Sequence, residues 1–332
     1  MNIVTQQFIT TFRTFPFLPS TTFLLSVSGG ADSMVLLHLF VSTQPLLKTT
    51  FAALHMNHHL RGSASDEDQN VVASFCKEHH VPVEIVHFHP SDWESVTGTG
   101  VEEKARKLRK QTLAKMCAKN SFDVSVIGHN QDDLCETFLF NFIRGSSPEK
   151  LSSILPIWDP KTTIFRPLLL YSRDKIRHYA SFYQIPFRED ATNQDVQFSR
   201  NRIRNNILPE ILRLNPRFSS SVLRFQTVLS GENDWIEKAV QDTMATWKIS
   251  SCSIRVPRSL FSTLHKALQR RSILQIRGML VGHREDFSFA SVETIRNSIL
   301  SHPQKNAILY SDSKMNVERE NEVINFRINE VV

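Results

Sequence analysis

Between residues 22 and 128, short apolar segments alternate with longer segments of helical periodicity. The apolar segments cover residues 22–27, 51–55, 82–88 and 123–128, and the helical ones cover about 32–42, 65–80 and 100–119. This alternation favours a parallel sheet covered by helices, in which ligands bind beyond the carboxyl ends of the strands. We therefore expect an α/β fold with a doubly wound parallel sheet.

The pattern changes after Pro209 and Pro216. Helical patterns follow at about 219–247, 259–280 and 290–300, and two strand patterns follow at 306–311 and 322–328. A chain of 332 residues is long for a single domain. We predict two domains, residues 1–215 and residues 216–332, of which the second is smaller and mainly α-helical.

The net charge of +6 is concentrated in the middle of the chain. Residues 161–217 hold eleven lysines and arginines against five aspartates and glutamates. This excess favours a polyanionic partner, although a solvated basic surface is the alternative. The four cysteines form no C-x-x-C pair, and no apolar run approaches the roughly 18 residues of a membrane span. We expect a reduced, cytoplasmic protein without a membrane segment, and the oligomeric state stays open, a homodimer included.

One loop has the composition of a phosphate-binding loop. Residues 28–33 read S-G-G-A-D-S and connect the first apolar segment to the first helical one. In that position the backbone N–H groups and the helix N-terminus converge on one point, which favours an anion such as phosphate. The patterns G-x-x-x-x-G-K-[ST] and G-x-G-x-x-G are both absent. An ordinary turn between a strand and a helix is the alternative interpretation.

Three carboxylates follow the fourth apolar segment, within G-H-N-Q-D-D-L-C-E-T at residues 128–137. If Asn130 caps a helix, Glu136 shares a face with Asp132 and with Asp133. Acids this close repel one another unless a cation or an ammonium group lies among them. Capping explains one or two of them, but Glu136 lies too far along the helix to gain much from its dipole. We interpret the cluster as a functional site.

The second apolar segment ends in H-M-N-H-H-L-R-G-S-A-S-D-E-D, residues 55–68. Histidine and asparagine side chains can hydrogen-bond a base or a ribose, and Arg61 can bind a phosphate. A metal site here would need carboxylate or thiolate companions that only the fold could supply. We expect Ser65 to cap the next helix, with the acids of residues 66–68 in its first turn.

Arginines recur in two further segments. In V-E-E-K-A-R-K-L-R-K, residues 101–110, Arg106 and Arg109 lie on one helical face, and a solvated face of ion pairs is the simpler interpretation. In residues 188–209, Arg200 and Arg204 stand among asparagines with few apolar anchors. Such arginines suit phosphate contacts better than packing, although a solvated loop is the alternative.

Six motifs in this order resemble bacterial tRNA(Ile)-lysidine synthetase, a family of PP-loop ATP pyrophosphatases with a Rossmann-like fold. They are S-G-G-A-D-S, H-M-N-H-H-L-R, E-E-K-A-R-K-L-R, G-H-N-Q-D-D-L-C-E-T, F-R-P-L-L and S-R-N-R-I-R-N-N-I-L-P. The resemblance covers residues 22–216, and the tail is similar to the single small C-terminal domain of the shorter members. One departure is Leu134, where the family more often has glutamine.

The resemblance implies an ATP-dependent ligase that modifies the wobble cytidine of tRNA(Ile) with a CAU anticodon. ATP first adenylates the 2-oxygen of the base and pyrophosphate leaves. The amino group of free L-lysine then displaces AMP, and the product is lysidine. Mg²⁺ would accompany the ATP, and the C-terminal domain would bind the tRNA.

The resemblance also implies a role for individual residues. Those that would contact ATP are Ser28, Gly29, Gly30, Asp32 and Ser33, and Asp32 would also bind Mg²⁺. Those implied in catalysis are Asp32, Arg106, Asp133 and Glu136, with Arg106 against ATP or the lysine carboxylate. Those that would bind lysine are Asp133, Glu136 and His129. Those that would bind tRNA are Arg61, Arg200, Asn201 and Arg204.

Two alternatives compete with this hypothesis. A PP-loop tRNA thiolase would need a catalytic cysteine or a C-x-x-C pair at a strand end, and the sequence offers neither. A nucleotide-binding module without catalytic activity should not need Asp32, Asp133 and Glu136 together.

Overall fold

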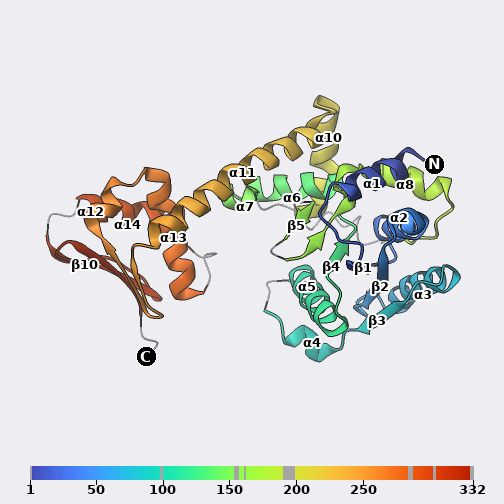
Figure 1. The fold of residues 1–332 in the computed structure, drawn as a ribbon, viewed down its shortest axis with the longest axis horizontal. Helices are drawn as coiled ribbons and strands as arrows, with labels where there is room; N and C mark the ends of the chain where they lie inside the picture. The colour runs from blue at the N-terminus through green and yellow to red at the C-terminus, as the bar shows by residue number, and fades with distance from the viewer. Residues whose placement is uncertain are drawn as a thin grey trace. The chain divides into compact units, whose positions relative to one another are not determined.

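The computed structural model describes residues 2–97, 100–152, 157–160, 162–189, 199–282, 287–301 and 304–329, apart from the side chains of residues 102, 199 and 200. The chain forms two compact units, Met1–Gln226 and Thr227–Val332 (Figure 1). The division falls within helix α11 (Phe218–Met244), later in the chain than the boundary after residue 215 that we predict from the sequence.

The first unit is built on a six-stranded sheet with the order β3-β2-β1-β4-β6-β5. Four strands match the predicted apolar segments: β1 (Thr22–Ser26), β2 (Thr50–Asn57), β3 (Val83–His87) and β4 (Val124–Ile127). These four and β6 (Ile164–Phe165) are parallel, and only β5 (Trp158–Asp159) runs antiparallel, beside β6. The predicted α/β fold with a parallel sheet is confirmed. Because β1 and β4 are neighbours, the segments that follow them meet at one edge.

A helix follows each of the first four strands. They are α2 (Ala31–Leu47), α3 (Ser63–Glu78), α5 (Val101–Asn120) and α6 (Gln131–Ile143). The first unit also contains α1 (Ile3–Arg13), α4 (Pro90–Glu94), α7 (Pro148–Ser152) and α8 (Arg173–Phe182). After the loop that follows α8, the chain forms α9 (Ser199–Arg202), a π-helical turn at Ile203–Ile207 and α10 (Leu208–Leu214).

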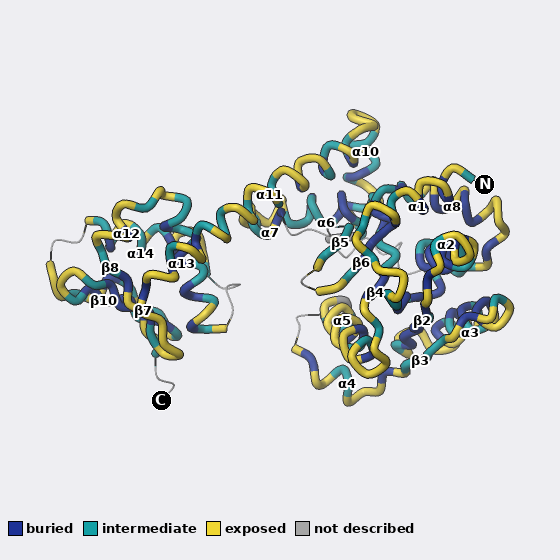
Figure 2. Tube along the Cα trace, in the orientation of Figure 1, coloured by how far each residue is buried: buried dark blue, intermediate teal, exposed yellow. Residues whose placement is uncertain are grey.

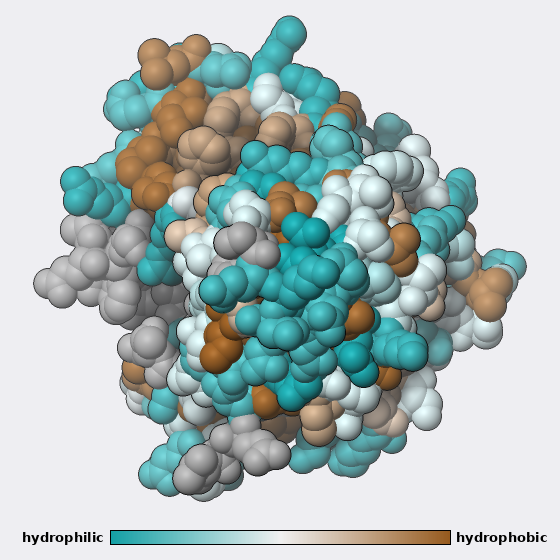
Figure 3. Space-filling model, turned by 90° about the vertical axis from the view of Figure 1, so that its left-hand side faces the viewer, coloured by the Kyte–Doolittle hydropathy of each residue, from teal (hydrophilic) through white to brown (hydrophobic). Residues whose placement is uncertain are grey.

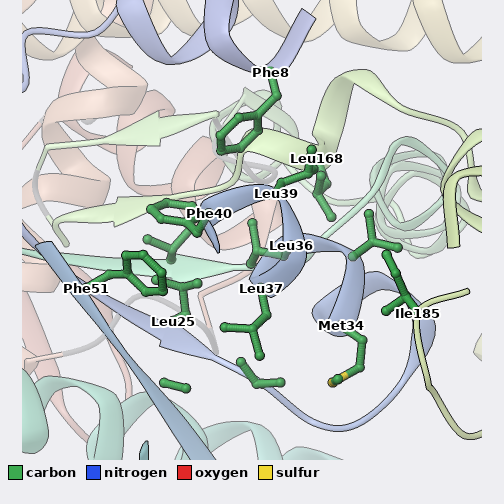
Figure 4. Close-up of a cluster of buried hydrophobic side chains, with 14 of the residues drawn as sticks. Phe8, Leu25, Met34, Leu36, Leu37, Leu39, Phe40, Phe51, Leu168 and Ile185 are labelled. Carbon is green, nitrogen blue, oxygen red and sulfur yellow. The ribbon is translucent and has the colours of Figure 1, made fainter. Parts of the chain in front are cut away.

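Hydrophobic side chains cover both faces of the sheet. Successive residues of a strand point to opposite faces, so Leu25 joins a cluster with Phe8 and Phe40, whereas Leu24 joins another with Leu54. Figure 4 shows the first cluster, where α1 and α2 pack against the strands. In Figure 2 the central strands β1, β2 and β4 are mostly buried, as is much of α2, whereas the outer side of α1 is exposed.

The second unit combines helices with a small antiparallel sheet. Its helices include α12 (Arg258–Thr263), α13 (Lys266–Val281) and α14 (Phe289–Ser301). The sheet has the order β7-β8-β11-β10-β9, with bounds Lys248–Ile249, Ser253–Pro257, Val323–Ile328, Met315–Glu320 and Asn306–Ser311. The mainly helical character is confirmed, but three of the five strands were not predicted. The surface turned toward the viewer in Figure 3 is hydrophilic over much of its centre, and hydrophobic residues gather at its upper left.

No helix in the described part of the chain is both long enough and apolar enough to cross a membrane.

Candidate functional site

The S-G-G-A-D-S segment joins β1 to α2, as predicted, and its last three residues already form the first turn of α2. Gly30 precedes the first residue of α2, and the hydroxyl of Ser33 donates to the carbonyl of Gly30 at 2.9 Å. The backbone N–H of Ser28 donates to Oγ of Ser33 at 3.1 Å, so the two ends of the loop are tied together. The loop therefore closes over the N-terminus of α2, which is the geometry of an anion site.

Gly29 needs to be glycine for two reasons. Its φ of +90° is a conformation that other residues rarely adopt, and a Cβ there would lie 3.1 Å from the backbone oxygen of Asp68. Asp68 is nearly buried and binds two arginines: Nη2 of Arg61 at 2.6 Å and Nε of Arg188 at 3.1 Å. The N–H of Arg188 also donates to the carbonyl of Gly29 at 3.0 Å. The glycine loop is thus bordered by two guanidinium groups held by one carboxylate.

Asn130 links the phosphate loop to the acid cluster. As predicted, it caps α6: its Oδ1 accepts from the N–H of Asp133, and Oδ2 of Asp133 accepts from the N–H of Asn130, both at 3.0 Å. Nδ2 of Asn130 donates to Oδ1 of Asp32 at 3.0 Å, although the two residues are 98 positions apart. Asn130 has no exposed surface. One buried amide therefore holds Asp32 and Asp133 in fixed positions.

A guanidinium group lies between two of the acids. Nε of Arg204 is 2.5 Å from Oε1 of Glu136, and Nη2 of Arg204 is 3.1 Å from Oδ1 of Asp133. Glu136 is fully buried, and Arg204 comes from the π-helical turn, which packs against α6. The sequence predicts that a cationic group lies among these acids, and the structure supplies one from the chain itself.

The electrostatics of the cluster favour a cation. Burial raises the pKa of Asp32, the nearby charge of Asp133 raises it further, and the hydrogen bond from Asn130 opposes this shift. Burial also raises the pKa of Asp132. Burial alone would lower the pKa of Arg204, but its hydrogen bond to Glu136 and the charges of Glu136 and Asp133 outweigh that effect and raise it. A further positive charge beside Asp32 would stabilise its ionised form.

A family model described as the PP-loop domain matches residues 2–211. The chain belongs to the PP-loop family. The resemblance seen in the motifs is also confirmed, because curated proteins named tRNA(Ile)-lysidine synthase are similar to this chain. That of Thermotoga sp. (strain RQ2) is 36% identical over 220 residues, which is 66% of this chain and 52% of the relative. That of Bacteroides thetaiotaomicron is 29% identical over 289 residues, which is 87% of this chain and 64% of the relative.

The chain therefore spans about half the length of the first of these relatives. Among solved structures, the U34-tRNA thiolase NcsA from Methanococcus maripaludis, with its [4Fe-4S] cluster, superposes with a TM-score of 0.57. It is 19% identical, and the match covers 68% of this chain and 78% of that chain. At this identity the similarity supports the PP-loop fold alone.

The histidine-rich end of β2 lies beside the segment that follows β1. His55 is buried, and its Nδ1 donates to the carbonyl of Val27 at 2.9 Å. The ring of His58 stacks on Phe88 with 4.7 Å between ring centroids, and burial lowers its pKa to about 4. Asn57 donates to Asp66 at 2.9 Å. These are neutral, hydrogen-bonding and stacking side chains.

The cap predicted for α3 is wrong. The helix begins at Ser63, after Gly62, so Ser65 lies inside the first turn and does not cap it. Its hydroxyl instead accepts from the N–H of Arg61 at 3.3 Å. Gly62 adopts a φ of +54°, which allows the sharp entry that starts the helix early.

The other predicted residues are spread around the strand ends. His129 lies half-buried between β4 and α6, and Asn201 lies half-buried on α9. Arg106 is exposed on α5, close enough to Arg166 to affect it: burial lowers the pKa of Arg166 to about 10, and the like charge of Arg106 contributes. The side chain of Arg200 lies outside the described residues. Leu134, the departure from the family motif, is fully buried in the core.

Two arginines near the site were not predicted from the sequence. Arg188 contacts the glycine loop, and Arg173 affects Asp32 and Asp132 through its charge at the start of α8. Arg188 opens a polar, arginine-containing segment, which was a usable signal. Arg173 follows the motif F-R-P-L-L by a few residues and looks like an ordinary helix-start residue.

Among the described residues, no group of three or more histidine, cysteine or acidic side chains is arranged to hold a metal ion. Mg²⁺ is usually bound by one or two carboxylates together with substrate phosphates. Asp32, which belongs to the S-G-G-A-D-S segment and lies near Asp133, is a carboxylate that could bind such an ion.

Proposed function

We propose that this PP-loop protein is an ATP-dependent ligase that joins lysine to the wobble cytidine of a CAU-anticodon tRNA(Ile) and forms lysidine. The observation that carries this proposal is the hydrogen bond from Asn130 to Asp32. It joins a phosphate loop to an acid pair that binds a cationic side chain. An enzyme that activates a base with ATP and then attacks it with an amine needs these two sites next to each other.

The first site would bind ATP and Mg²⁺. The backbone of Ser28, Gly29, Gly30 and the side chain of Ser33 would contact the phosphates, and Asp32 would hold the Mg²⁺. Mg²⁺ would supply positive charge that offsets the charge on the reacting phosphate. The 2-oxygen of cytidine forms a bond to the α-phosphorus, and pyrophosphate leaves with the electrons of the broken bond. Arg61 and Arg188 border the loop on the side of Asp68.

The second site would bind the lysine ammonium. The guanidinium of Arg204 stands in for that group, because it is a cationic donor between Asp133 and Glu136. Lysine would replace Arg204, and Arg204 would then be available to a phosphate of the tRNA. Asp133 or Glu136 accepts a proton from the ammonium, and the resulting amine attacks the activated carbon while AMP leaves. His129, at the start of the same loop, would line the lysine site.

Recognition of the tRNA would involve Arg61, Arg200, Asn201 and Arg204, together with the C-terminal part of the chain from residue 216 onward. Arg106 would contact ATP or the lysine carboxylate. The basic excess of residues 161–217 supports a polyanionic substrate at this end of the sheet.

The experiment is to incubate the protein with radiolabelled lysine, ATP, Mg²⁺ and an unmodified CAU-anticodon tRNA(Ile) transcript. We expect lysine in the tRNA, with one AMP and one pyrophosphate released per lysine. Asp32→Asn should reduce the rate by about 10²-fold or more, because the charge that holds Mg²⁺ at the reacting phosphate is lost. A tRNA that stays free of lysine with the wild-type protein contradicts the proposal, and ATP binding without turnover would then favour the nucleotide-binding module.

A further inference from the structure

The face of α6 that carries the acid pair continues toward the end of the helix. Asp133, Glu136, Phe140 and Arg144 follow one another at spacings of three, four and four residues, so they lie along one side of α6. At a rise of about 1.5 Å per residue, Phe140 lies about 6 Å and Arg144 about 12 Å beyond Glu136 along the helix axis. Whatever binds at the acid pair and extends along this face meets Phe140 and Arg144 next.

Phe140 and Arg144 form a stacked pair. The guanidinium carbon of Arg144 lies over the Phe140 ring, 4.2 Å from its centre, which is a cation–π contact. Arg144 is exposed, and it forms no ion pair with any carboxylate in the described part of the chain. The side chain of Arg144 is therefore accessible to solvent.

The neighbouring helix adds positive charge. α9 and the π-helical turn pack against α6, and Arg202 on α9 is exposed. An exposed arginine over an aromatic ring, on a helix packed against another that carries an exposed arginine, suits single-stranded nucleic acid, because a guanidinium can stack on a base and donate hydrogen bonds to a phosphate. The positive charge of these two arginines favours an anionic strand as the partner.

We propose that the Arg144–Phe140 pair binds a nucleotide of the anticodon loop adjacent to the reacting cytidine, with the guanidinium of Arg144 on its phosphate. The inference rests on the proposed function, since it needs an RNA strand whose reacting base enters the acid site. Phe140 acts as a positioning residue that holds the guanidinium of Arg144 over its ring. Arg144 thereby adds one phosphate contact outside the chemical step.

The test measures binding of a fluorescein-labelled CAU-anticodon tRNA(Ile) transcript by anisotropy, between about 50 and 200 mM salt. We expect Arg144→Gln to raise Kd about tenfold and to reduce the steepness of log K against log salt by about 0.7, the contribution of one phosphate on a single strand. Arg144→Lys and Phe140→Leu keep the charge, so they should keep the salt dependence and raise Kd about threefold. Arg13→Gln, at an exposed arginine of α1, is the matched control and should behave as the wild type.

Other outcomes overturn the inference. Arg144→Gln could bind tRNA with the Kd and the salt dependence of the wild type. Arg144 would then have only a structural role at the C-terminus of α6, most clearly if the melting temperature of the variant also falls. A change from monomer to dimer that depends on Phe140 would assign this face to a second copy of the chain. If the wild type transfers lysine while Arg144→Gln binds tRNA normally, this inference alone fails. If the wild type transfers no lysine, the proposed function fails first.

Discussion

Arg204 donates from Nε to Oε1 of Glu136 at 2.5 Å, and the carboxylate it contacts is fully buried. The same guanidinium reaches Asp133 at 3.1 Å. An isolated carboxylate in the position of Glu136 would be costly to keep ionised, so the arginine stabilises its charged form. Arg204 thus keeps the carboxylates of Asp133 and Glu136 ionised, which is the form that binds a cation.

Arg204→Ala should destabilise the protein and open the proposed lysine site. Removing one partner of a buried ion pair costs about 3–5 kcal/mol, because the other charge is left uncompensated. Free lysine should then bind between Asp133 and Glu136 and raise the melting temperature of the variant more than that of the wild type. Thermal melts with and without lysine, and urea unfolding, measure both effects.

The control for this variant is Arg213→Ala. Arg213 forms an ion pair with Glu210 on the surface of α10, where such pairs contribute at most about 1 kcal/mol. Equal losses of stability in the two variants would contradict the buried pairing of Arg204. An unchanged response to lysine would contradict its role as a stand-in for the ammonium group.

Gly29→Ala should abolish nucleotide binding and reduce stability. The left-handed φ of +90° costs about 1–2 kcal/mol for alanine, and its methyl group would press against the backbone of Asp68. The loop must then shift away from the position that the phosphates require. ATP binding measured by calorimetry and urea unfolding test this expectation.

Gly231→Ala is the matched control for Gly29. Gly231 lies within α11, and a Cβ there would meet nothing within 4 Å. Alanine should stabilise the helix by about 0.5–1 kcal/mol and leave ATP binding unchanged. If Gly29→Ala bound ATP as well as Gly231→Ala does, the close approach at Asp68 would not matter for the loop.

His38 should make the stability of the protein depend on pH. Its Nδ1 lies 3.1 Å from the hydroxyl of Tyr179, and burial, with the charge of His79, lowers its pKa from 6.5 to about 4. The folded protein therefore resists protonation that the unfolded chain accepts, so stability is present above about pH 6.5 and is lost as the pH falls toward 4.

Urea unfolding between pH 7 and pH 4.5 measures this loss, at most about 1.4 kcal/mol per pH unit for one group. His58 has its pKa lowered to a similar value, so it should contribute in the same direction. His38→Asn should reduce the slope of the unfolding free energy against pH by an amount equivalent to at most one proton. His80→Asn, at an exposed histidine, is the control. A slope that His38→Asn leaves unchanged would mean that His38 does not titrate in this way.

The cysteines should be dispensable for the reaction. Cys76 and Cys135 are buried, and burial raises the pKa of each thiol to about 11; burial also raises that of Cys117. Because the thiolate is the reactive form, these three are poor nucleophiles at neutral pH. A variant with all four cysteines replaced by serine or alanine should still transfer lysine to tRNA. Loss of the chemistry in a folded variant would favour the thiolase instead.

The sequence was sufficient where a signal is local. Apolar segments and glycines predicted β1 to β4 and the loop before α2, because strand burial and backbone conformation depend on adjacent residues. The three unpredicted strands of the second unit are different. The alternating segment Ser253–Pro257, for example, pairs along its whole length with β11, which lies about 70 positions away, and over two residues with the adjacent β7.

The sequence by itself therefore determined the fold class, the phosphate loop, the cap at Asn130 and the presence of an acid cluster that needs a cation. The tertiary structure decided which groups meet. It placed β4 beside β1, so that Asn130 donates a hydrogen bond to Asp32. It also placed Arg204 next to Glu136, from which it is separated by 68 positions in the chain. Periodicity and capping act within a few residues, whereas the partner of a buried charge is chosen by strand order and by the packing of distant helices.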